Sequence, residues 1–149
     1  MPSPLVRALR ERHGLPVLDE ATIDVFLARA AREPAHALIL FAGDPAQRSE
    51  SNDIAVILPE LLKAFAGALR GAVVARAAED RLKSRFHVVV APSLVVARGA
   101  ETIDVIAKVR DWSEYVARIR AALAPDAPAM SAGAGPKTEF RFCTPRTDA

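Results

Sequence analysis

Residues 88–112 read VVVAPSLVVARGAETIDVIAKVRDW, and this stretch decides the fold. Its apolar and β-branched residues at 94–97 and 103–107 predict two strands. Arg98, Gly99 and Ala100 join these strands, and this connection is short enough for an antiparallel hairpin. Asp111 then precedes an amphipathic pattern, and Glu114 three residues later completes the pattern of a helix capping box. We therefore expect this part of the chain to form a hairpin followed by a helix.

Upstream of this stretch, short apolar runs alternate with helical patterns. In chain order the predicted elements are a helix at 4–13, a short strand at 15–18, a helix between Asp19 and Pro34, a strand at 36–42, a helix at 54–65, a strand at 72–75 and a short helix at 79–86. Helices that cross over between successive strands place those strands parallel, whereas the hairpin makes the last pair antiparallel. The sequence therefore predicts an α/β fold with a mixed sheet and helices on both of its faces.

A polar segment separates the strand at 36–42 from the next helix. Residues 43–53 read GDPAQRSESND, which is typical of a loop. Asn52 or Asp53 can cap the helix that follows. Pro59 falls inside that helix and should kink it, because proline lacks the N–H that a continuous helix needs.

The charge and cysteine content exclude several classes of function. With 20 basic and 18 acidic residues, the formal charge of +2 leaves no excess for binding the phosphate backbone of nucleic acids. The single cysteine, Cys143, excludes an internal disulfide, a CxxC pair and a cysteine-rich metal site. The sequence shows no secretory signal, and no apolar run approaches the ~20 residues of a membrane span. We expect a cytoplasmic protein without a membrane span.

The composition changes after Ala124. Residues 125–149 are rich in Pro, Ala, Gly, Ser and Thr, and lack the apolar content that would offset their ordering entropy. We therefore predict one folded domain at 1–124 and a disordered Pro/Ala/Gly-rich tail at 125–149. Phe140 and Phe142 are the exceptions in this tail, and they could dock on the body or on a partner.

Three segments of the chain carry a resemblance to a known family. They read FAGDPAQRSESNDIAVILPELLKAF, AEDRLKSRFHVVVAPSLVVARG and VIAKVRDWSEYVARIRAAL. Together with the opening helix, and over residues 5–124, the chain resembles the HyaE/HupG family of thioredoxin-like accessory proteins in the maturation of uptake nickel–iron hydrogenases. The resemblance implies a thioredoxin-like three-layer fold with a mixed four- to five-stranded sheet. It also implies a cis bond between Ala91 and Pro92.

The resemblance also implies a function. Members of this family are expected to be non-enzymatic chaperones that bind the hydrogenase small-subunit precursor with its twin-arginine signal peptide and delay its export. A second accessory protein could join that complex. Counting back from Pro59 by the spacing of the superfamily puts the two redox positions at Ser51 and Ile54. Neither side chain can form a thiolate, so dithiol exchange is not expected.

Two other functions remain open. A thioredoxin-like thiol-disulfide oxidoreductase would have to use Cys143 as a single thiol, or a thiol of its substrate. A structural adaptor domain in a larger assembly would dock through the tail around Phe140 and Phe142. An insulin-reduction assay separates the first of these functions from peptide binding, and a tail deletion separates the second.

The candidate peptide site lies around the polar loop and the cis-proline. In active thioredoxins this surface holds extended polypeptide, so we expect an extended segment in the groove between residues 43–53 and Pro92. Carboxylates along the groove would pair with arginines of the signal peptide. Helix capping and complementarity to the helix dipole are the alternative roles of these carboxylates. The predicted peptide-binding residues are Asp44, Glu50, Ser51, Asp53, Glu60 and Pro92.

We predict no catalytic residue, no cofactor and no metal. His13, His36 and His87 are far apart in the sequence and lack the spacing of metal ligands. Ser93 is not part of the GxSxG elbow that a nucleophilic serine on an α/β fold requires. The glycine-rich motifs of nucleotide sites are also missing from the sequence.

Overall fold

The computed structural model describes residues 4–28, 34–44 and 50–130. Statements on the structure below concern these residues. In chain order the elements are α1 (Pro4–His13), β1 (Val17–Leu18), α2 (Ile23–Leu27), β2 (His36–Phe41), α3 (Glu50–Ala64), β3 (Leu69–Val74), the 3-10 helix η1 (Arg76–Ala78), α4 (Glu79–Leu82), β4 (Ser93–Arg98), β5 (Glu101–Ala107) and α5 (Trp112–Ala122).

The sheet is mixed and has five strands in the order β1-β3-β2-β4-β5. β1, β3 and β2 are parallel, β4 is antiparallel to β2, and β5 is antiparallel to β4. The crossover helices and the hairpin predicted from the sequence account for this pattern. The arrangement is the thioredoxin-like three-layer α/β fold, as the resemblance implies.

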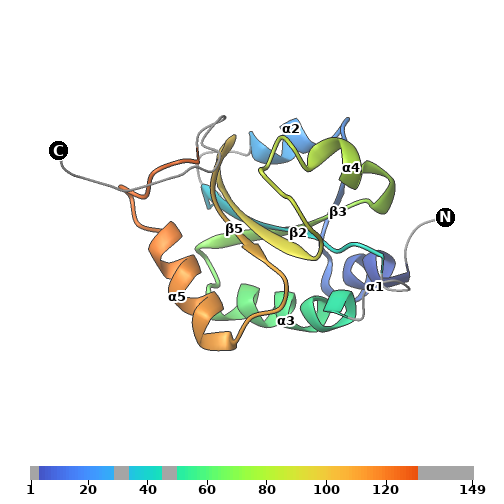
Figure 1. The fold of residues 1–149 in the computed structure, drawn as a ribbon, viewed down its shortest axis with the longest axis horizontal. Helices are drawn as coiled ribbons and strands as arrows, with labels where there is room; N and C mark the ends of the chain where they lie inside the picture. Colours follow the sequence, from blue (N-terminus) through green and yellow to red (C-terminus); the bar gives the residue numbers. More distant parts are fainter. Residues whose placement is uncertain (1–3, 29–33, 45–49, 131–149) are drawn as a thin grey trace.

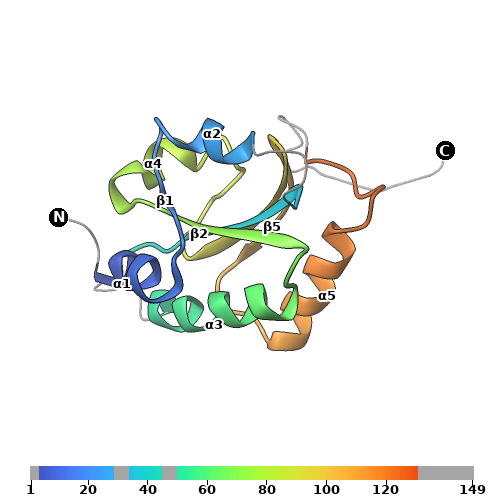
Figure 2. The same cartoon turned by 180° about the vertical axis from the view of Figure 1, so that it is seen from behind.

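Helices cover both faces of the sheet (Figures 1 and 2). α1, α3 and α5 lie on one face, and α2 and α4 lie on the other. Each face has its own apolar core. The α3 face includes Leu9, Leu58 and Tyr115, and the α2 face includes Ile23 and Phe86. Strand β2 serves both cores because its residues alternate between the faces, which explains its almost wholly apolar sequence.

Helix α3 begins earlier than the sequence predicts. Its first residue is Glu50, so Asn52 and Asp53 lie in its first turn and the prediction that one of them is the cap is wrong. Ser51 explains the difference, because its side chain turns into the body and donates a hydrogen bond to the Ala42 carbonyl. That contact holds the first turn of α3 against the end of β2. Residues 45–49 of the predicted loop lie outside the described residues.

The capping box predicted at the start of α5 is also wrong. Asp111 has the extended backbone of an N-cap but makes no side-chain cap hydrogen bond. The Glu114 carboxylate instead faces Arg118 one turn further along α5, at 3.7 Å. The ion pair within the helix takes the place of the capping contact.

Two other helices are shorter than predicted. α4 ends at Leu82, and turns lead on to His87, which has a φ of 62°. α2 ends at Leu27, well before Pro34. The prediction that Asp19 caps this helix is wrong, because the N-cap residue of α2 is Thr22. Asp19 Oδ1 instead accepts the N–H groups of Ala21 and Thr22 in the turn that precedes α2.

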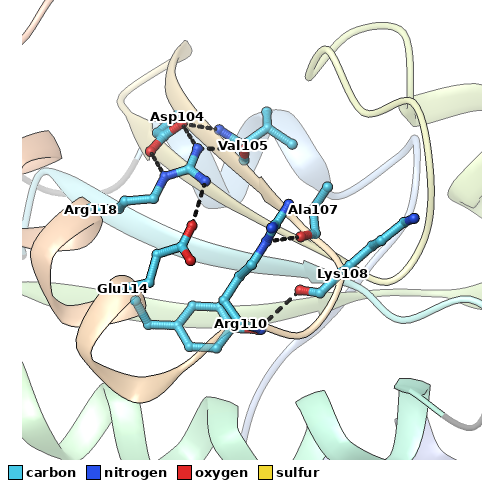
Figure 3. A network of polar contacts seen from close by, with 8 residues as sticks. Asp104, Val105, Ala107, Lys108, Arg110, Glu114 and Arg118 are labelled. Carbon is cyan, nitrogen blue, oxygen red and sulfur yellow. Dashed lines mark hydrogen bonds and ion pairs between the residues drawn. The ribbon is translucent and has the colours of Figure 1, made fainter.

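The outer edge of β5 is covered by side chains and by the segment after α5 (Figure 3). Arg118 pairs with Asp104 in a two-bonded contact of 3.0 and 2.6 Å, and also donates to the Val105 carbonyl. Asp104 in turn accepts the Val105 N–H, and Arg110 Nε donates to the Ala107 carbonyl. Main-chain groups along β5 are therefore bonded within the chain.

The segment after α5 also belongs to the folded body. The Met130 N–H donates to the Thr102 carbonyl of β5 at 2.7 Å, and Arg98 donates to the Ala127 carbonyl. Ala127 packs against the α3-face core. Residues 125–130 thus contact the body, although the sequence predicts a disordered tail from 125. Residues 131–149, with Cys143, Phe140 and Phe142, lie outside the described residues. Among the helices of the described residues, none has the length and apolar content to cross a membrane.

Candidate functional site

Three segments of the chain meet at Gly43. A Cβ atom on Gly43 would lie 3.0 Å from the Cβ of Ala91 and 3.5 Å from Ser51 Oγ. Gly43 also has a φ of 76°, which L side chains rarely adopt. The end of β2, the start of α3 and the segment before β4 therefore approach one another at a point where only glycine fits without strain.

Pro92 lies on the β4 side of this contact. The Ala91–Pro92 bond is cis, which confirms the expectation from the resemblance. The Pro92 carbonyl accepts the Lys108 N–H at 2.8 Å, and Ser93 Oγ donates to the Val90 carbonyl at 2.5 Å. The segment before β4 is therefore held from both sides by backbone contacts.

The two positions expected from the resemblance to carry the redox pair hold a hydroxyl and a hydrocarbon side chain. Ser51 is completely buried, and its hydroxyl is bonded to the Ala42 carbonyl at 2.5 Å. Ile54 is also completely buried and belongs to the core between α3 and the sheet. Both positions thus serve packing and local hydrogen bonding. The one sulfhydryl of the sequence, Cys143, lies outside the described residues.

Asp44 is the predicted acidic residue that directly follows Gly43 in the chain. It is half-buried and lines a small polar cavity of about 190 Å³ together with Ala91, Lys83 and Glu79. Val89 also lines this cavity and is 91% exposed. The structure therefore brings Asp44, Ser51 and Pro92 together around Gly43.

Glu79 at this cavity is a residue that the sequence analysis did not single out. Only 1% of its surface is exposed, and its Oε2 accepts the Gly43 N–H at 3.0 Å. Burial raises the pKa of the Glu79 carboxyl above its usual range, and the Gly43 N–H, Arg76 and Lys83 oppose part of that rise. Its position in the first turn of α4 gives no sequence signal for this role, since Gly43 lies 36 residues earlier.

The other predicted acidic residues follow α3 away from Gly43. Glu50 is half-buried in the first turn and lies close enough to Tyr115 to add to the rise in the pKa of its phenol, which burial causes mainly. Asp53 is exposed. Glu60 is exposed two turns further on and pairs with Lys63 at 3.3 Å. The three carboxylates are therefore spread along α3: Glu50 and Asp53 lie on either side of Ser51 in its first turn, and Glu60 lies two turns away.

Glu60 borders a different cavity, between α1 and α3. This cavity has a volume of about 340 Å³ and is lined by Leu9, Ala55, Val56 and Pro59 among others, with Arg12 and His13 at its rim. Glu60 thus lies outside the contacts around Gly43 and Pro92.

The described residues show no group of three or more His, Cys, Asp or Glu side chains that could hold a metal ion. His36 lies at the start of β2, and burial lowers the pKa of its imidazole. That end of β2 pairs with Arg98 of β4, whereas Phe41 at its other end pairs with Ser93 next to Pro92. His36 is therefore remote from Pro92.

Comparisons with known proteins agree with the resemblance seen in the sequence. A family model described as hydrogenase-1 expression protein HyaE matches residues 5–115. The hydrogenase expression/formation protein HupG of Rhizobium leguminosarum bv. viciae is 61% identical over 140 residues, which cover 94% of each chain. The hydrogenase expression/formation protein HoxO of Azotobacter vinelandii is 38% identical over 148 residues, covering 95% of this chain and 94% of its own.

A solved structure extends this agreement to three dimensions. The crystal structure of a hydrogenase expression/formation protein HupG from Rhodopseudomonas palustris matches with a TM-score of 0.52 and 46% sequence identity. The match covers 73% of this chain and 95% of that chain. Sequence, fold and family model thus agree, and the chain belongs to the HyaE family of hydrogenase expression proteins.

Proposed function

We propose that this protein is a non-enzymatic accessory chaperone in nickel–iron hydrogenase maturation. It binds the hydrogenase small-subunit precursor and its twin-arginine signal peptide in the cytoplasm, before export. The observation that carries this proposal is the pair of Ser51 and Ile54 at the redox positions of a thioredoxin-like fold whose cis-proline is kept. The hydrogenase part of the proposal draws support from the family and from the names of the relatives.

The geometry around Gly43 is suited to holding an extended peptide. The backbone of Gly43 and Asp44 faces the Val89–Ala91 segment across a polar cavity, and Val89 projects into solvent. Backbone at such a site can bond to a peptide main chain, and an exposed apolar side chain can contact a peptide side chain. Gly43, Val90 and Pro92 are held by hydrogen bonds within the chain, so keeping them in place on binding would cost little ordering entropy.

The carboxylates near this surface would give the protein a preference for basic peptides. Asp44 lies at the cavity, and Glu50 and Asp53 lie in the first turn of α3. Arginine pairs with carboxylates through two parallel hydrogen bonds, which would favour a signal peptide with two adjacent arginines. Long-range attraction by these charges would also raise the association rate and make it sensitive to salt.

Affinity purification of the full chain from cells that grow on hydrogen tests the proposal. Cells would express the small-subunit precursor either complete or without its signal peptide. We expect capture of the complete precursor and loss of capture without the signal peptide. Equal capture of both forms would contradict the assignment of the signal peptide as the recognised segment.

An insulin-reduction assay tests the non-enzymatic part. A buried serine hydroxyl is far less acidic than a thiol and cannot replace the attacking thiolate. We expect the full chain to reduce insulin no faster than the uncatalysed reaction, and Cys143→Ser to behave identically. Turnover that disappears in Cys143→Ser would instead support an oxidoreductase.

A further inference from the structure

Glu79 is a buried carboxylate for which the proposed function gives no role. Its Oε2 accepts the Gly43 N–H at 3.0 Å, and its Oε1 lies 3.4 Å from Arg76 Nη1. The residue is 1% exposed, whereas its neighbour Asp80 on the same helix has an 87% exposed side chain. Burying a carboxylate costs free energy unless it is well bonded, so the bond to Gly43 offsets part of that cost.

Gly43 lies close to the start of α3 and to the segment before β4, which are the other two sides of the groove. Its backbone is close enough to Ala91 that an added Cβ atom would lie 3.0 Å from the Ala91 Cβ. Ser51 Oγ lies on the same side, 3.5 Å from that Cβ position. Gly43 thus lies between the loop after β2 and the segment that precedes β4, where a shift of its backbone would change the separation between them.

We propose that Glu79 is a positioning residue for the peptide groove: by holding the Gly43 N–H, it sets the distance between the Gly43–Asp44 backbone and the Ala91–Pro92 segment. This inference rests on the proposed function for its effect on peptide affinity. The effect on Gly43 itself does not depend on any ligand. Without the carboxylate, the loop loses its link to α4, and the groove loses its preformed width.

The charged groups around Glu79 come from three elements. Arg76 belongs to η1, Asp80 belongs to α4 and Lys83 directly follows it, and Asp44 follows β2. Arg76 and Lys83 favour the ionised carboxyl, but burial outweighs them and raises the pKa of Glu79. A protonated carboxyl is a weaker acceptor than a carboxylate. The Gly43 contact should therefore weaken on acidification at a higher pH than contacts of exposed glutamates.

Nuclear magnetic resonance of the 15N-labelled full chain tests the contact without a peptide. The Gly43 amide resonance is followed from neutral to acidic pH in wild type, Glu79→Gln and Asp80→Asn. We expect a titration with a midpoint above that of an ordinary glutamate in wild type and Asp80→Asn, and no such titration in Glu79→Gln. A Gly43 amide that titrates alike in wild type and Glu79→Gln would overturn the proposal.

Peptide affinity tests the consequence for the groove. Asp80→Asn is the matched control for the loss of charge, because it removes the same charge from an exposed residue of the same helix and of the same cavity without removing the bond to Gly43. We expect Glu79→Ala to weaken binding of a twin-arginine signal peptide about tenfold and Asp80→Asn less than about twofold, as the loss of one buried charged hydrogen bond suggests. Glu79→Gln keeps an acceptor oxygen for Gly43 and should fall between them.

The Gly43 titration and the affinity measurements together distinguish failure of the positioning role from failure of the proposed function. Equal losses in Glu79→Gln and Asp80→Asn would mean that the charge attracts the peptide, and this would overturn the positioning role. If wild type itself does not bind the peptide, the proposed function fails, while the Gly43 titration still decides whether Glu79 holds the loop. Should Glu79→Ala not fold, Glu79→Gln supplies both measurements.

Discussion

The β5 edge and the groove around Gly43 use polar side chains in opposite ways. At the β5 edge, Asp104 of β5, Arg110 after it and Arg118 of α5 all bond to main-chain groups of β5 (Figure 3). An edge strand with free main-chain groups invites pairing with another chain, and side chains or covering segments prevent it. The edge is therefore poorly suited to accept an added strand.

In the groove, polar side chains bond to the backbone of the loops from inside the protein, and the outer surface of these loops remains exposed. Ser51 holds the end of β2, Glu79 holds Gly43, and Ser93 holds Val90. Val89 beside them is 91% exposed, and a polar cavity lies next to it. This difference supports the proposed binding of an extended partner at the groove. It also suggests variants that change one region while leaving the other intact.

Gly43→Ala should have the largest effect, because it disturbs the groove directly. The new Cβ atom would meet Ala91 at 3.0 Å in a backbone conformation that disfavours side chains. We expect a loss of about 2–3 kcal/mol in the free energy of unfolding and a loss of peptide binding of at least about tenfold. Chemical denaturation and calorimetric titration measure the two effects.

Gly99→Ala is the matched control for Gly43→Ala. Gly99 has a φ of 58° in the turn of the hairpin, but its added Cβ atom would meet no atom within 4 Å. The substitution should cost about 1 kcal/mol for backbone strain alone and leave peptide affinity unchanged. If both variants lose the same stability, the close approach of the new Cβ atom to Ala91 does not contribute to the destabilisation of Gly43→Ala.

Charge reversal at the start of α3 should have the next largest effect. The double variant Glu50→Lys/Asp53→Lys should weaken binding of the signal peptide about tenfold at low salt, and should flatten the salt dependence of the affinity. The control double variant, Glu101→Lys/Asp126→Lys, changes the net charge equally at two exposed residues near the far end of β5. An unchanged affinity in Glu50→Lys/Asp53→Lys would show that these two residues do not contact the signal peptide.

Arg118→Ala opens the β5 edge and should leave the groove intact. It removes both bonds to Asp104 and the bond to the Val105 carbonyl, on side chains that are about a third exposed. We expect a loss of about 1–2 kcal/mol in stability, with self-association that increases with concentration and unchanged peptide affinity. Sedimentation velocity measures the association. Arg120→Ala, at an exposed position on the same helix, should remain like wild type, and a monomeric Arg118→Ala would contradict the blocking role.

Glu79 should have the smallest effect on stability, and its sign depends on pH. Because the pKa of Glu79 is raised in the folded protein, folding takes up a proton between the ordinary glutamate pKa and the raised one. The contribution of Glu79 to stability therefore falls as the pH rises through this window. We expect wild type to lose stability relative to Glu79→Gln between acidic and neutral pH, measured by denaturation at several pH values. A constant difference would show that the carboxyl does not titrate abnormally.

The sequence predicted the parts of the fold that follow from local patterns. The two hairpin strands were located because their apolar character is unambiguous. In the structure they span 93–98 and 101–107, one or two residues longer at their ends than predicted. The start of β3 was missed at Arg70 and Gly71, which look like loop residues. The structure explains both: Arg70 donates to the carbonyls of Phe26 and Pro34, and Gly71 leaves room for Leu62 of α3.

The candidate site was only partly accessible from the sequence. Ser51 and Pro92 could be placed because the spacing from Pro59 and the cis-proline segment are local features of the resemblance. Glu79 could not be placed, because its bond to Gly43 joins residues that are 36 positions apart and depends on how α4 packs on the sheet. The contact of residues 125–130 with the folded body was missed for a similar reason. It depends on a bond between residues far apart in the sequence, because the Met130 N–H donates to the Thr102 carbonyl of β5.

Chemical-shift mapping of the 15N-labelled full chain with the small-subunit signal peptide tests the central claim most directly. The account predicts saturable shifts that are largest at Gly43, Asp44, Ser51 and Ala91, with little change at Val105 of the β5 edge. Shifts centred on β5, or no shifts with a peptide that contains both arginines, would contradict it.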